Sequence, residues 1–309
     1  MKNLLSRFIP IVVIGLFFTG CTTAQTIIES KKFEAESIKK VEIEGSFVNI
    51  RITSGSGSMV SFDGEIEGPE RYRGDFEIKS ELDGSMLKIW LEKPKNVYGN
   101  IRGKWDISLP TGTQLIVSNN SGNVKASGLS GDELTINCSS GNIEVDNLAG
   151  NISLKASSGN ISAFGLEGNI SAKASSGNVS ISDAIGNVDC KTSSGNIRIK
   201  DLSKTFLTAT ASSGEIYLDE VEGKLSVKCN SGNIKGENIR LEGDSNFNTT
   251  SGNISIYTKN GIEDLSFDLS SNSGDLRVGD NRKAEDRLII KRGDILVTGR
   301  ATSGNIRIY

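Results

Sequence analysis

Along the second two thirds of this chain the dipeptide Ser-Gly recurs in a spaced series of ten, and its spacing limits the folds that the chain can adopt. From the first to the seventh glycine the interval is 18 or 19 residues, and later intervals lengthen to at most 30. Further glycines at 150, 168 and 186 halve the period to nine between 141 and 195. An internal period of this size indicates stacked units, each covering the hydrophobic face of its neighbour. The ten glycines are Gly122, Gly141, Gly159, Gly177, Gly195, Gly214, Gly232, Gly252, Gly274 and Gly304.

Hydrophobic residues keep the same phase from unit to unit, with Gly236 as the exception at the fourth following position. Counted from the Ser-Gly glycine, the second and fourth following positions are apolar, as in Ile161 and Ala163, and so is the fifth preceding position, as in Leu154. The third preceding position is small, as in Ala156, and polar residues lie between. This alternation of period two predicts two short strands per unit, each with one face inward.

A parallel stack explains this constant phase better than an antiparallel meander does. In such a stack, residues of equal phase lie one above another about 4.8 Å apart, so that aliphatic columns form inside and polar columns outside. We therefore predict an all-β fold, a single-stranded right-handed parallel β-helix (β-solenoid) with coils of about 18 residues over 115–309. Ten coils would make a rod roughly 45–50 Å long.

Residues 38–114 lack the period but still contain alternating segments, for example 47–52 and 86–91, and they hold both tryptophans. Solenoids need atypical terminal units that close the core and block edge pairing. We expect irregular β coils or a small cap over 38–114. After Gly252 the coils lengthen, and we expect charged loops over 280–287.

The N-terminus has the pattern of an export signal. Lys2 and Arg7 precede an apolar run over 8–18 that is too short to span a bilayer as a helix, so 1–20 reads as a signal peptide. The run ends in Phe-Thr-Gly followed by Cys21, which resembles a bacterial lipobox although Phe replaces the usual Leu. The alternative is ordinary cleavage near residues 22–24.

A lipobox would make Cys21 the acylated N-terminus, with 21–37 as a tether and the lipid as the contact with the membrane. Because no Asp and no acidic cluster follow Cys21, sorting patterns favour the outer membrane, with the periplasmic or surface face left open. We expect an exported protein that is anchored in the cell envelope.

Composition excludes several classes of function. The chain has no His, which removes the commonest general base, the Ser-His-Asp and Cys-His systems and most zinc sites. Without residues 1–20 the net charge is -5, which gives no reason to expect nucleic acid as a partner. Cys138, Cys190 and Cys229 fall in the inward columns, so we expect buried free thiols rather than disulfides.

Asparagine follows most of the Ser-Gly glycines. We assign these residues to a structural corner ladder, because Gly gives a positive φ and the Asn amide bonds between coils. A binding row is the functional alternative. Glu215 and Asp275 interrupt the series, whose members are Asn123, Asn142, Asn160, Asn178, Asn196, Asn233, Asn253 and Asn305.

One series of carboxylates lies five or six residues after the glycines of consecutive coils. Stacked carboxylates could hold a cation or raise one another's pKa, but a solvated corner near Lys200 and Lys204 is the interpretation we favour. The turn also lacks the Asp of calcium-binding nonapeptide repeats. We expect no metal and no cofactor. The five candidates are Asp183, Asp201, Asp219, Glu220 and Glu237.

The unit Ala-Ser-Ser-Gly-Asn-Ile at 156–161 resembles the bacterial "putative adhesin" family, a domain of unknown function. The segments 41–50 and 109–113 share this resemblance, which spans roughly 38–309. It implies a right-handed β-helix on exported or envelope proteins, and it supplies no catalytic residue.

These observations predict a non-enzymatic envelope lipoprotein, an adhesin-like binding or structural rod whose partner is an unidentified protein or glycan. One alternative is a polysaccharide-active β-helix enzyme that uses the acidic series, although such enzymes have longer coils with loops that build a cleft. Another is a periplasmic accessory of an envelope signalling or stress system.

Overall fold

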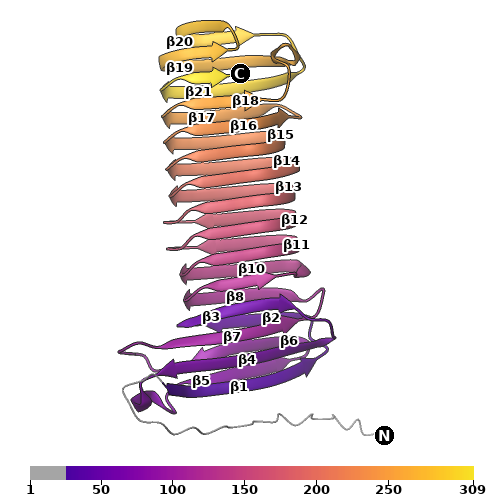
Figure 1. Cartoon of the computed structure of the whole chain (residues 1–309), viewed down its shortest axis with the longest axis vertical. Helices are drawn as coiled ribbons and strands as arrows, with labels where there is room; N and C mark the ends of the chain where they lie inside the picture. Colours follow the sequence, from indigo (N-terminus) through magenta and orange to yellow (C-terminus); the bar gives the residue numbers. More distant parts are fainter. Residues whose placement is uncertain (1–25) are drawn as a thin grey trace.

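The computed structural model describes residues 26–309, apart from the side chains of 284 and 285. These residues form a long stack of parallel strands that ends in antiparallel strands on both sides (Figure 1). The prediction of an all-β parallel solenoid is confirmed. Within residues 26–309, no helix is long and apolar enough to cross a membrane.

Seven successive strands make the regular part of the rod. Strands β9 and β10 together make one coil, and both pair in parallel with β11. From β11 on, each strand pairs in parallel with the next, so that Ile143 lies against Ile161 and Ile161 against Val179. The strands are β9 (Val124–Ser127), β10 (Ser130–Ser140), β11 (Ile143–Ala156), β12 (Ile161–Ala174), β13 (Val179–Ser194), β14 (Ile197–Ser213) and β15 (Ile216–Ser231).

Each regular coil has three straight segments. In β11 they cover 143–146, 148–149 and 152–156, and they meet at Asn147 and Gly150. Six side chains of this coil point inward and are buried: Ile143, Val145, Leu148, Ile152, Leu154 and Ala156. Burying each larger aliphatic side chain contributes about 1.5–3 kcal/mol, which lets a narrow core hold together without aromatic residues.

Every second residue of the segments on either side of the Ser-Gly corner faces solvent. We name the segment after the corner face A (143–146 in β11) and the segment before it face C (152–156 in β11). Parallel pairing then places the outward residues of successive coils in straight columns on each face.

The two ends of the rod depart from sequence order. The first coil, β2 (Lys40–Gly45) and β3 (Val48–Ser54), lies between β6 (Met86–Glu92) and β8 (Gln114–Ser121) on one side. On the other side it lies between β7 (Arg102–Leu109) and β9. Strands β6 and β7 therefore extend the N-terminal end of the rod, and the chain then returns to the opposite side of this first coil, where β8 and β9 begin the regular stack.

The C-terminal end repeats this arrangement. Strands β16 (Ile234–Leu241), β17 (Ser245–Ser251) and β18 (Ile254–Thr258) continue the stack. The last strands, β21 (Ile295–Ser303) and β22 (Ile306–Ile308), lie between β17 and β18 on one side and β19 (Leu265–Val278) on the other. Figure 1 shows the C-terminus inside the stack, beneath β19.

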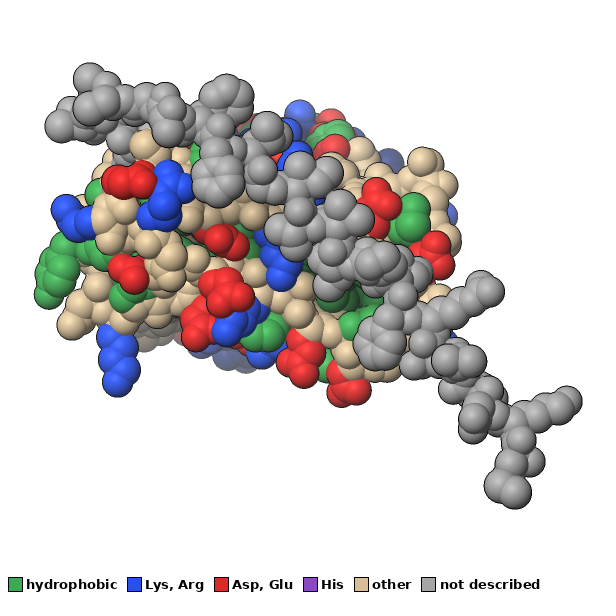
Figure 2. Space-filling model, turned by 90° about the horizontal axis from the view of Figure 1, so that it is seen from below, with side chains coloured by type: hydrophobic (Ala, Val, Ile, Leu, Met, Phe, Trp, Pro, Cys, Tyr) green, Lys and Arg blue, Asp and Glu red, His purple; other side chains and the backbone are tan. Residues whose placement is uncertain are grey.

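Antiparallel strands close both ends. Strand β1 (Thr26–Glu36) pairs with β4 (Met59–Gly68), which pairs with β7, and β5 (Glu77–Asp83) pairs with β6. The outermost strands are rich in charge, and the view onto the β1 end shows acidic and basic side chains interspersed (Figure 2). Charged edge strands prevent another chain from adding to the sheet.

Two sequence predictions need correction, and the order of the last coils is a further finding. Residues 26–36 of the expected tether form strand β1, because their alternating side chains pack on β4. The charged stretch 280–287 is largely strand β20 (Asn281–Ile290), which pairs with β19, and not a loop. Coils 265–278 and 295–308 stack in the reverse of their sequence order.

Candidate functional site

The predicted lipidation site, Cys21, lies outside the described residues, as do the signal peptide over 1–20 and residues 22–25. The other cysteines behave as expected: Cys138, Cys190 and Cys229 are free and buried. Burial raises the pKa of Cys138 to about 12 and also raises the pKa of Cys190 and Cys229. These thiols are therefore protonated and unreactive at neutral pH.

The corner asparagines form a ladder that is interrupted between Glu215 and Asn233 among the described residues. The side-chain Oδ1 of each accepts the backbone N–H of the equivalent residue on the next coil, as from Asn160 to Asn142 and from Asn178 to Asn160, both at 2.9 Å. The amide oxygen is thus engaged within the fold, whereas a binding row would leave it free. The full set of acceptor and donor residues is Asn49, Asn123, Asn142, Asn160, Asn178, Asn196 and Glu215, and then Asn233, Asn253, Asn305 and Asp275.

The corner glycines are required for two different reasons. A positive φ occurs at Gly122 and Gly214 but not at Gly159 and Gly177, so the expected left-handed backbone is absent from the most regular coils. There the constraint is close approach, because a Cβ on Gly177 would lie 1.9 Å from the carbonyl oxygen of Gly159.

The five acidic candidates divide between two neighbouring columns. Asp183, Asp201 and Glu220 have φ of 53°, 52° and 53°, and share their column with Asn147, Gly165 and Asn238, which are also left-handed. Asn, Asp and Gly adopt this conformation most easily, so the turn explains the two aspartates without a ligand. Asp219 and Glu237 stand in the adjacent outward column of face A.

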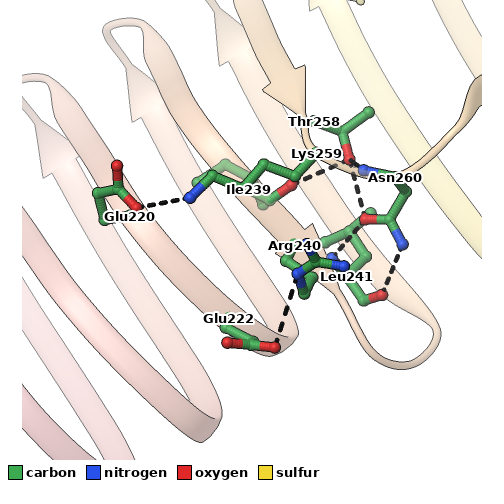
Figure 3. Close-up of polar contacts among 8 residues, drawn as sticks. All are labelled: Glu220, Glu222, Ile239, Arg240, Leu241, Thr258, Lys259 and Asn260. Atoms are coloured by element: carbon green, nitrogen blue, oxygen red, sulfur yellow. Dashed lines mark hydrogen bonds and ion pairs between the residues drawn. The ribbon is translucent and has the colours of Figure 1, made fainter.

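Most of these carboxylates are paired within the chain. Lys259 Nζ lies 2.6 Å from Glu220, and Figure 3 shows this pair beside the separate Arg240–Glu222 pair. Lys200 lies 3.8 Å from Asp201.

Glu237 and Asp219 are engaged as well. Lys235 and the Tyr217 hydroxyl both hydrogen-bond Glu237, and they hold the pKa of its carboxyl below its ordinary value. Asp219 accepts from the Asn238 amide at 3.0 Å. Among the described residues, no group of three or more His, Cys, Asp and Glu side chains could hold a metal ion.

A different feature stands out on face C, where β12, β13 and β14 present a shallow hollow of about 280 Å³. The Phe206 ring forms one wall and is 45% exposed, with Lys224 5.7 Å from its centroid. Asn169, Asn187 and Asp189 also line the hollow, whose exposed surface is mostly apolar.

The asparagines of the hollow belong to a second ladder. Nδ2 of Asn187 donates to Oδ1 of Asn169, and Nδ2 of Asn169 to Oδ1 of Asn151, each at 3.0 Å. Each amide keeps one donor hydrogen that no described residue accepts, and these hydrogens are available to a ligand. The glycines at 150, 168 and 186 mark this corner in the sequence, and the asparagine after each glycine was the signal for the ladder.

A larger groove of about 470 Å³ lies near the N-terminal end, between β3, β7 and β9. Its charges are largely matched, because Arg102 pairs with Glu67 and Lys104 with Asp106. Arg51 also reaches Asp106, at 3.8 Å. This groove presents a balanced surface of ion pairs, in contrast to the mostly apolar surface of the hollow on face C.

Comparison with known proteins assigns the family. A model of the Toastrack DUF4097 family matches residues 69–184 and again 149–308, which is most of the chain. The chain belongs to the Toastrack DUF4097 family. The expected membership of a family of unknown function is thereby confirmed at the level of the family. A search of curated proteins finds no match to the chain.

Solved structures also resemble this Toastrack chain. A "putative adhesin" from Bacteroides fragilis is 14% identical, with 94% of this chain and 100% of that chain covered and a TM-score of 0.34. A "putative lipid binding protein" from Parabacteroides distasonis is 13% identical, with 91% and 96% covered and a TM-score of 0.35. A "putative cell adhesion protein" from Clostridium sporogenes is 12% identical, with 91% and 99% covered and a TM-score of 0.20.

Proposed function

We propose that this chain is a non-enzymatic lipoprotein of the cell envelope, whose rigid rod binds a glycan in the hollow on face C. The observation that carries the proposal is the exposed Phe206 ring beside the Asn169 and Asn187 amides. An aromatic face offers apolar area to the C–H face of a sugar ring, and side-chain amides can both donate to and accept from its hydroxyls. Sites that combine an apolar wall with a few directed polar groups are the usual form of a small-ligand site.

The geometry also supports binding over catalysis. Glycoside hydrolysis needs two carboxyl groups on either side of the bond that breaks. Asp189 is the one carboxylate that lines the hollow, and Lys173 pairs with it at 3.0 Å. The acidic series around Asp201 lies at the left-handed corner and lines no part of the hollow.

The chain offers a matched pair of variants for a test. Phe206 and Phe164 are exposed to similar extents, 45% and 49%, but Phe164 stands on face A, where Ser182 is its neighbour. We expect full-length Phe206→Ala, purified in detergent, to lose binding on a glycan array by about tenfold or more, which corresponds to ~1.4 kcal/mol. Phe164→Ala should retain binding. Equal binding by the two variants would contradict the assignment of the hollow.

Enzymatic activity and anchoring are tested separately. Turnover of any polysaccharide by the wild-type chain that disappears in Asp201→Asn would overturn the non-enzymatic proposal. For the anchor, we expect Cys21→Ser to release the protein from the membrane fraction, since one residue carries the acyl chains. Unchanged membrane association in this variant would contradict lipidation at Cys21.

A further inference from the structure

Four lysines lie in one straight column on face C. Pairing places Lys155 against Lys173, Lys173 against Lys191, Lys191 against Thr210 and Thr210 against Lys228. We name these four residues, Lys155, Lys173, Lys191 and Lys228, the lysine column. Successive coils are about 4.8 Å apart, so the first three ammonium-bearing side chains start from directly adjacent positions.

The lysine column contains almost no compensating charge. The pairing continues without an acidic residue through Asn137, Lys155, Lys173, Lys191, Thr210, Lys228, Asn248, Arg300, Ser270 and Arg287. Within the described part of the chain, Lys155, Lys191 and Lys228 form no ion pair, and Lys173 pairs with Asp189 in the next column.

This arrangement is unfavourable unless something binds to it. Like charges directly opposite one another on neighbouring strands destabilise a sheet. Face A shows what the chain does elsewhere: Lys125 pairs with Glu144 at 2.5 Å, and Lys235 pairs with Glu237 at 2.6 Å. Three of the four residues of the lysine column lack such a partner, although the net charge of the chain is negative.

The columns on either side of the lysines are mainly neutral and can form hydrogen bonds. One side presents Ser157, Ser175 and Ser193, which are exposed. The other side presents Ser171, Asp189 and Thr208, of which Asp189 pairs with Lys173. This side leads directly into the hollow, which begins two residues away from the lysines along the same strands. The cations thus run as a single file beside the hollow and parallel to the rod axis.

We propose that the lysine column binds a linear acidic polysaccharide, with a carboxylate on each sugar, laid along the rod axis with one ring in the hollow. This inference rests on the proposed glycan-binding function and adds the charge and the direction of the ligand. A single file of cations matches one extended chain of carboxylates. A duplex nucleic acid or a membrane surface presents its charges over a broader area.

The test compares two triple variants with the same change of charge. Lys155→Thr, Lys173→Thr and Lys191→Thr together remove the continuous part of the lysine column, and Thr210 shows that this position accepts threonine. The control replaces Lys125, Lys200 and Lys235 on face A with threonine. Each full-length protein, purified in detergent, is titrated with oligogalacturonate and with the same oligomer after methyl esterification, which removes the charge.

We expect the wild-type chain and the control to prefer the acidic oligomer. The face C variant should lose this preference, with roughly a ten- to hundredfold weaker affinity for the acidic form and little change for the ester. Added salt should weaken the wild-type interaction, because exposed charges are screened.

Several outcomes would overturn the inference. Equal losses in the two triple variants would show that only net charge matters, and stronger binding of duplex DNA than of oligogalacturonate would identify another partner. If the wild-type chain binds neutral glycans through Phe206 and shows no preference for the acidic oligomer, the proposed role of the lysine column is refuted, but the proposed glycan-binding function is not. A chain that binds no glycan would refute the proposed function as well. Because relief of repulsion should leave the melting temperature of the face C variant equal or higher, a fall in that temperature would also contradict the inference.

Discussion

The backbone N–H of Asn305 donates to Oδ1 of Asn253 at 2.9 Å, although the two residues are 52 positions apart. Asp275 in turn donates its N–H to Oδ1 of Asn305 at 2.8 Å. The ladder therefore runs from Asn253 to Asn305 to Asp275, and the last coil of the chain closes a gap within the stack. At the other end, Asn123 donates to Asn49 across 74 positions. At both ends of the rod, hydrogen bonds between residues far apart in sequence thus hold the terminal coils in the stack.

Completing the ladder at its one interruption should stabilise the rod. Glu215 accepts no hydrogen bond from the N–H of Asn233 within the described residues, whereas every neighbouring corner has such a bond. Glu215→Asn supplies the missing acceptor, and we expect it to raise the free energy of unfolding by about 0.5–1.5 kcal/mol. Chemical denaturation of the full-length chain measures this change. Asn178→Ala, which removes an acceptor in the middle of the ladder, should lower the same free energy by a similar amount.

The interior of the repeat could be predicted from sequence, and the ends could not, for a physical reason. Between Gly122 and Gly252 each coil contacts the next along the chain, so the phase of residues such as Ile161 and Val179 directly reports their stacking. At the ends, β2 and β22 stack against segments that are not their neighbours in sequence, so spacing carries no information on the order. The sequence does mark Asn49 as a corner residue, because Ile50 follows it just as Ile143 follows Asn142.

The candidate site shows the same division. The corner asparagines were found because they recur, while the acidic series was assembled from a rough spacing and divides into two columns once the backbone is placed. Phe206 escaped notice since its coil contains an extra residue, which shifts the register between Leu202 and Thr205. The lysine column was visible in the sequence as Lys155, Lys173 and Lys191 at intervals of 18.

Because the coils approach closely, replacing a corner glycine with alanine should cost more stability than replacing a glycine in open space. In Gly177→Ala the new Cβ would collide with a backbone carbonyl, and neither coil can move without breaking its ladder. We expect a loss of about 3 kcal/mol or more in the free energy of unfolding. Gly112 has a φ of +83° but open space around it, so Gly112→Ala should cost only about 1 kcal/mol. Equal effects of the two changes would contradict the close stacking of coils.

The left-handed corner gives a test of the role of Asp201. If its φ of 52° is the reason for this residue, Asp201→Asn should leave stability nearly unchanged, because Asn tolerates the same conformation. Asp201→Val should lower the free energy of unfolding by about 1–2 kcal/mol, since a β-branched side chain resists it. The comparison is made by urea denaturation. A large loss in Asp201→Asn would show that the charge itself is needed.

The buried thiols predict how stability depends on pH. Burial raises the pKa of Cys138 to about 12 and raises the pKa of Cys190 and Cys229, whereas in the unfolded chain these thiols titrate near the ordinary thiol pKa of 9.0. Above that value the unfolded state releases protons that the native state retains, so unfolding becomes more favourable as pH rises. We expect the melting temperature of full-length Cys21→Ser to fall between pH 8.5 and 11. Replacing Cys138 and Cys190 with alanine should flatten this fall.

Alkylation at constant pH tests the burial of the three thiols in a second way. At pH 8, iodoacetamide should leave all three thiols unmodified in the native state and modify them after denaturation, because the reactive species is the thiolate and all three side chains are covered by neighbouring coils. Mass spectrometry counts the added groups. Rapid modification of Cys190 in the native protein would show that the coils separate there, because its side chain is fully enclosed between β12 and β14.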